Sequence, residues 1–189
     1  MVQRIMKCGL IGGLILFVWG AVSWTILPWQ KGQMKSFSDE SEVRSAIMDN
    51  AKGSGLYVLP NLHKYGNNAE EIAAAKARMA EGPYVVAAVS VEGRNPSMAG
   101  SSVLSLMLKI VAASLVTWLL FKTQQNNQLD FNKSVKFVTV VGVVIALLAT
   151  IPYGIWFAFP AHFVIGSIIE IVFGWFFAGL AISKLAMHR

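Results

Sequence analysis

The chain has 189 residues, of which 55% are hydrophobic and only 14% are charged. This composition excludes an ordinary soluble domain, in which roughly a quarter of the residues are charged. The formal net charge is +6, but residues 28–100 contain eight Lys or Arg and eight Asp or Glu. The hydrophilic part is therefore neutral and has no basic stripe, so we expect no nucleic-acid partner.

Four apolar runs are each close to the ~20 residues that cross ~30 Å of hydrocarbon as a helix. The first follows Arg4 and Lys7 and continues beyond a weak cleavage match at residues 21–23, so we expect an uncleaved signal anchor. The predicted spans are residues 9–27, 103–121, 135–157 and 161–182. The fold class predicted is an all-α membrane bundle of four transmembrane helices, with the lipid bilayer as its surroundings.

The basic residues predict the orientation of this bundle, because Lys and Arg are enriched in short cytoplasmic loops. The loop around Phe159 and Pro160, between the third and fourth spans, has no basic residue. We therefore expect cytoplasmic termini and an extracytoplasmic insert of residues 28–100, which leaves residues 1–27 and 101–189 as the membrane parts. The basic residues that share the predicted cytoplasmic side are Arg4, Lys7, Lys122, Lys133, Lys136, Lys184 and Arg189.

The insert has no Asn-x-Ser/Thr acceptor that is free of proline, since Asn95 is followed by Pro96. An extracytoplasmic segment without glycosylation sites fits a bacterial inner membrane. The expected place of the insert is then the periplasm.

The insert reads as a small α/β unit. Asp39 and Glu42 have capping-box spacing and predict a helix over residues 39–51, and Asn68 caps a second helix over residues 68–80. The segments 55–59 and 84–91 are rich in β-branched and aromatic residues and predict two strands. The expected order is α, β, α, β.

So small a unit, without disulfides, is near the limit of independent stability. Cys8 is the only cysteine of the chain and lies outside the insert. We expect the insert to be stabilised by contact with the ends of the membrane helices, with a second copy, or with another membrane or periplasmic protein. The plainer alternative is an inert cap on the helices.

No residue pattern predicts catalysis. His63 is the only histidine of the insert, and no nucleophile and base stand at a recognised spacing near it. No group of His, Cys, Asp or Glu has metal-ligand spacing. We therefore expect no catalytic residue, no metal and no cofactor, and we rank a membrane enzyme below the other interpretations.

The most informative residues are two charges inside the predicted spans. Lys109 and Glu170 lie ~9 Å and ~13 Å below the outer ends of two helices that run in the same direction, so they can meet in the bundle. A charge in hydrocarbon is costly unless it is paired or hydrated. We expect both on small-residue stripes facing the bundle interior. The predicted intramembrane polar cluster consists of Lys109, Glu170, His162, Ser105 and Thr150.

Two interpretations of this cluster stay open. It holds the helices in register, or it borders a polar cavity that takes a small solute, a lipid headgroup or a proton, with Glu170 as the switchable group. Two functional hypotheses follow. The first is a non-enzymatic accessory or assembly subunit whose insert contacts another envelope component, and the alternative is a protein that handles a small solute, a lipid or an ion at Lys109 and Glu170.

Overall fold

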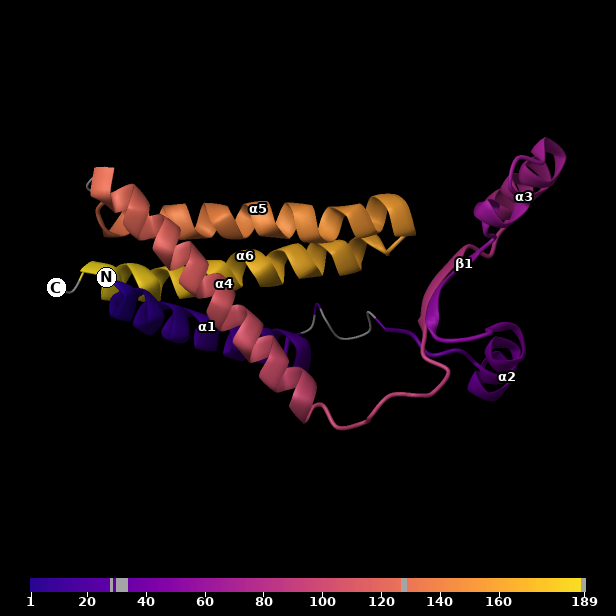
Figure 1. Cartoon of the computed structure of the whole chain (residues 1–189), viewed down its shortest axis with the longest axis horizontal. Coiled ribbons are helices and arrows are strands. Elements are labelled where there is room, and N and C mark those ends of the chain that lie inside the picture. Colours follow the sequence, from indigo (N-terminus) through magenta and orange to yellow (C-terminus); the bar gives the residue numbers. More distant parts are fainter. Residues whose placement is uncertain (28, 30–33, 127–128, 188–189) are drawn as a thin grey trace. The chain divides into compact units, whose positions relative to one another are not determined.

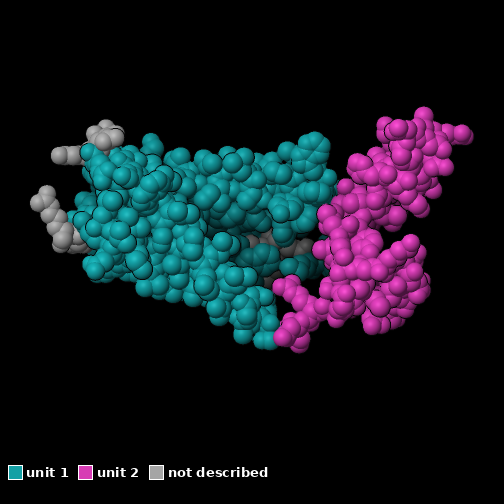
Figure 2. Space-filling view, viewed as in Figure 1, with its two compact units in different colours: residues 1–35, 97–189 teal, residues 36–96 magenta. Residues whose placement is uncertain are grey.

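A computed structural model of the chain describes residues 1–27, 29, 34–126 and 129–187. The chain divides into two compact units, which Figure 2 shows in different colours. Unit 1 combines Met1–Lys35 with Ser97–Arg189, and unit 2 is Ser36–Pro96.

Unit 1 contains four long helices: α1 (Val2–Thr25), α4 (Ala99–Asn126), α5 (Phe131–Phe157) and α6 (Ala161–Met187). Each is long and apolar enough to cross a membrane, so the four predicted apolar helices are confirmed. All four extend several residues beyond their predicted apolar runs into polar flanks. Helix α5 begins where Asp130 accepts a hydrogen bond from Lys133 N at 2.8 Å. This backbone bond lowers the pKa of the Asp130 carboxyl.

The four helices pack in the order α4, α1, α6, α5, and α4 has only a small contact with α5. Figure 1 shows α6 between α5 and α1. Glycine permits the closest approach of α1 to α4, because a Cβ at Gly13 would lie 2.5 Å from Ile110 Cα. In the same way, a Cβ at Gly142 of α5 would overlap Trp175 of α6. Small residues therefore set the helix spacing, as expected for helices that associate in lipid. The buried apolar core comprises Cys8, Leu16, Ala113, Val116, Leu120, Phe121, Val138, Trp175, Ala178, Ile182 and Ala186.

Unit 2 contains α2 (Glu40–Asn50), β1 (Gly55–Leu59), the 3-10 helix η1 (Leu62–Tyr65), α3 (Ala69–Glu81) and β2 (Val85–Val89). The predicted α, β, α, β order is confirmed. The segment between β1 and α3, for which no regular element was predicted, contains η1, because Asn61 caps its first turn by accepting from His63 N at 3.0 Å. The second strand is shorter than predicted, since a turn closed by Gly93 N donating to Ser90 O at 3.1 Å follows it.

The strands β1 and β2 pair antiparallel, with Gly55 opposite Val89 and Leu59 opposite Val85. Next to the Gly55 and Val89 end of this pair, the Ser54 hydroxyl donates a hydrogen bond to the Glu92 carboxylate. This hydrogen bond lowers the pKa of that carboxyl. Both strands belong to a two-stranded sheet, so across residues 36–96, all of which are described, each strand has an outer edge without a partner strand.

Unit 2 has almost no core of its own. The helix α2 has no buried residue, and Ala75 of α3 is the one buried apolar residue of its helices and strands. In Figures 1 and 2, α2 and α3 form separate lobes of this unit, joined by a narrow connection that contains the strands. The helices of unit 2 therefore do not cover each other's apolar faces.

Candidate functional site

Lys109 points from α4 toward α1. Its ammonium Nζ donates to the backbone oxygen of Leu16 at 3.2 Å and lies 5.6 Å from the centroid of the Phe17 ring. Gly20, one turn further along α1, leaves room for this arrangement, because a Cβ there would lie only 2.7 Å from Nζ. The ammonium is therefore held by a carbonyl and an aromatic face, two groups that favour a cation in apolar surroundings.

Glu170 of α6 lies close to the same point. The same Cβ at Gly20 that would lie 2.7 Å from Lys109 Nζ would lie 3.4 Å from Glu170 Oε1. The nitrogen and this carboxylate oxygen are therefore at most about 6 Å apart. Trp19 fixes the backbone here by donating from its Nε1 to the Glu170 carbonyl oxygen at 2.8 Å. The sequence predicted that the two charges lie close together, but it did not predict their contacts with Leu16, Phe17 and Trp19.

One signal in the sequence could have located α1 at this site. Gly20 stands at a depth similar to the two charges, and a glycine beside two long side chains indicates where they cross a neighbouring helix. The acceptor itself had no signal, because any helix carbonyl can accept a second hydrogen bond and the sequence does not show which one a lysine reaches.

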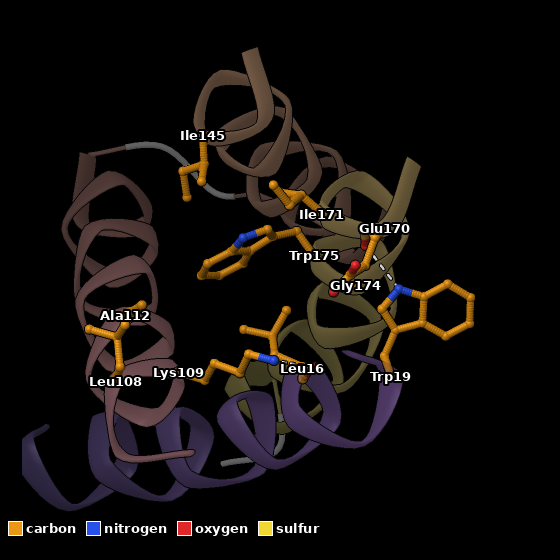
Figure 3. A pocket seen from close by; sticks show the side chains of 10 residues that line it. All are labelled: Leu16, Trp19, Leu108, Lys109, Ala112, Ile145, Glu170, Ile171, Gly174 and Trp175. Carbon is orange, nitrogen blue, oxygen red and sulfur yellow. Dashed lines mark hydrogen bonds between the residues drawn. The ribbon is translucent and has the colours of Figure 1, made fainter. Parts of the chain in front are cut away.

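Lys109 and Glu170 line a cavity of about 210 Å³ inside unit 1 (Figure 3). All four helices contribute to its walls, and α5 provides Ile145. Apart from the two charges and two tryptophans, the lining is aliphatic or small. The lining residues are Leu16, Trp19, Leu108, Lys109, Ala112, Ile145, Glu170, Ile171, Gly174 and Trp175.

Trp175 projects its indole ring into the middle of this space (Figure 3). Its side chain is held by Gly142 of α5, and the residue is only 5% exposed. Its Nε1 has no hydrogen-bond acceptor among the described residues. Among the described residues only Ser183 Oγ is a fully buried side-chain polar atom without a partner, so the Trp175 N–H is accessible from the cavity.

The other three members of the predicted cluster lie elsewhere. His162 is exposed at the beginning of α6, and Ser105 is half-buried one turn before Lys109. Thr150 is buried, but it donates to Ala146 O of its own helix at 2.6 Å. None of them lines the cavity, so its polar groups are the two charges and two indoles.

The arrangement has no feature of a metal centre. Within residues 1–27, 29, 34–126 and 129–187, no three His, Cys, Asp or Glu side chains are grouped closely enough to hold an ion. The cavity offers hydrogen-bond donors and one carboxylate in apolar walls.

The four apolar helices are consistent with an integral membrane protein, and Lys109 and Glu170 line a cavity among these helices. Comparison of the chain with protein-family models, with curated proteins and with solved structures gives no significant match.

Proposed function

We propose that this protein is a non-enzymatic accessory or assembly subunit of a membrane complex, and that its insert contacts another envelope protein. The observation that carries this proposal is the lack of a core in unit 2. A segment of this size that buries so little apolar surface gains little free energy from folding alone.

The apolar side chains of unit 2 are placed where a partner can cover them. On α2, Ile47 and Met48 are exposed, although a helix with an apolar face normally buries it. On the sheet, Leu56, Leu59 and Val85 are exposed as well. Burying such side chains against a partner stabilises by roughly 25 cal/mol for each Å² of apolar surface removed from water.

The sheet supports the same role through its backbone. Each five-residue strand has an outer edge whose N–H and C=O groups are not paired within the sheet. An exposed edge accepts an added strand from another chain, and main-chain hydrogen bonds then supply affinity. We infer an extended segment of an envelope protein as the partner.

Site-specific photocrosslinking from α2 in native membranes tests this proposal. A crosslinking residue at position 47 should form a stoichiometric adduct with one other protein, and the same residue at position 45, about 200° away around the helix, should not. Ile47→Lys should reduce recovery of the partner in mild detergent at least tenfold, while the matched Ser45→Lys should leave it unchanged. Both positions are exposed, so neither change disturbs a core.

Two results would reject the accessory role. One is the absence of any adduct at position 47 in the native membrane. The other is an adduct formed only between two copies of this chain, which would make the insert a homo-oligomer contact.

A second candidate function is the handling of a small solute, a lipid or an ion at Lys109 and Glu170. The observation that favours it is the cavity of about 210 Å³ that both residues line. Loss of cellular function in a stable double mutant of these residues, described in the Discussion, tests it.

A further inference from the structure

We propose that the cavity in unit 1 binds one neutral, ring-sized lipophilic molecule whose carbonyl oxygens accept hydrogen bonds from both Lys109 and Trp175. This inference rests on the second candidate function and names its ligand class. It is independent of the partner of the insert.

The size of the cavity indicates a single ring. Its volume is about 210 Å³, whereas an apolar cavity of ~150 Å³ in another protein takes up benzene. The extra volume accommodates substituents on one ring. Leu108, Ile145 and Ile171 supply aliphatic walls from three helices.

The cavity contains N–H donors that favour an occupant with a hydrogen-bond acceptor. An ammonium has three N–H bonds, and the hydrogen bond of Lys109 to Leu16 O uses one of them. The Trp175 indole adds a further N–H that has no acceptor among the described residues. Hydrocarbon accepts no hydrogen bond, so an occupant with a carbonyl oxygen binds more tightly than an acyl chain or an alkyl ring.

The two charges that line the cavity favour a neutral occupant. The Glu170 carboxylate lies at most about 6 Å from Lys109 Nζ and already balances its charge. An anion would enter near this carboxylate and lose its hydration in apolar surroundings, which is costly. A carbonyl oxygen takes the same donors without either cost.

The cavity also offers a route that suits a lipophilic molecule. It is partly open, and α4 and α5, which both line it, have only a small contact with each other. A molecule dissolved in the bilayer reaches such a site sideways, between helices, without crossing water.

A matched pair of ligands tests the inference. Tetramethyl-1,4-benzoquinone and tetramethylbenzene have the same ring and methyl groups and differ in two carbonyl oxygens. The full chain in lipid nanodiscs is dialysed against each compound, with empty nanodiscs correcting for partition. We expect saturable binding of one quinone per chain, and at least about tenfold weaker binding of the hydrocarbon.

Three variants and a control localise the binding. Trp175→Phe and Lys109→Met should each weaken quinone binding by about tenfold and leave hydrocarbon binding unchanged. Ala112→Phe, which fills the cavity, should abolish binding of both compounds. Leu104→Phe on the exposed side of α4 should affect neither. If Lys109→Met does not fold, Trp175→Phe keeps the donor requirement testable.

Equal affinity for the two compounds would overturn the carbonyl requirement while leaving an apolar binding site in place. No saturable binding of either compound, or binding that Ala112→Phe does not reduce, would overturn the cavity as a site. Neither result bears on crosslinking at position 47, so the accessory role is judged separately.

Discussion

Removing the charges of Lys109 and Glu170 one at a time and together measures what holds the site in the bundle. Their charged atoms are at most about 6 Å apart, which at an effective dielectric constant of about 20 corresponds to at least about 3 kcal/mol of attraction. Each of Lys109→Met and Glu170→Gln leaves the other charge without this interaction. We therefore expect each single change to lower the free energy of unfolding by about 3 to 5 kcal/mol.

The double variant should recover about 3 kcal/mol relative to the sum of the single losses, because no orphan charge remains. The loss from Lys109→Met includes its hydrogen bond to Leu16 O, worth about 1.5 to 3 kcal/mol for a charged donor, which the double variant does not restore. The assay is reversible unfolding of the purified chain in mild detergent for the four members of the cycle. Lys136→Met, at an exposed basic residue of α5, is the control and should change stability by no more than about 0.5 kcal/mol.

Additive single losses, with a coupling below about 0.5 kcal/mol, would refute the charge interaction. The same variants separate the roles of the site in the cell. A double variant that is stable and fully functional makes the site structural. One that is stable and inactive assigns Lys109 or Glu170 a role beyond packing and supports the second candidate function.

Three further predictions concern packing, capping and topology. Gly13→Ala should lower the free energy of unfolding by about 1 to 3 kcal/mol, because its new methyl group meets backbone of α4, whereas Gly100→Ala, which meets nothing within 4 Å, should not destabilise. The pKa of Asp39 is lowered by the backbone N–H groups it caps. The N-terminal turn of α2 should therefore be stable above that pKa and fray as the pH falls through it, below about pH 4. NMR of the chain should show this fraying, and Asp39→Asn should abolish the pH dependence while keeping a cap. In a Cys8→Ala background, Glu70→Cys should react with an impermeant maleimide from outside the cytoplasm, and labelling only after the cytoplasmic side is opened would reverse the predicted orientation.

The sequence determined the helices and strands because their causes are local. Runs of apolar residues of membrane-spanning length predicted α1, α4, α5 and α6. Asp39 and Asn68 predicted the beginnings of α2 and α3, since a side chain that accepts backbone N–H groups at a helix start acts within three residues. The strand over residues 55–59 was likewise confirmed at both ends.

The placement of Lys109 and Glu170 near each other could also be predicted, because two helices that run in the same direction bring residues at similar depth to the same level. Which other residues meet them was beyond the sequence. The acceptor Leu16 O, the Phe17 ring and the donor-bearing Trp175 come from helices whose rotation about their own axes depends on how all four pack together.

Two features depend on tertiary packing: the two charges border a cavity, and unit 2 has almost no core. Because α4 and α5 have only a small contact, space remains between the helices. The apolar pattern of each helix would be the same in a bundle without this space. In the same way, Val43 and Ile47 have the spacing of a buried helix face, yet α2 buries none of its residues. A sequence specifies which faces are apolar, but the surface that covers each face depends on distant parts of the chain or on another molecule.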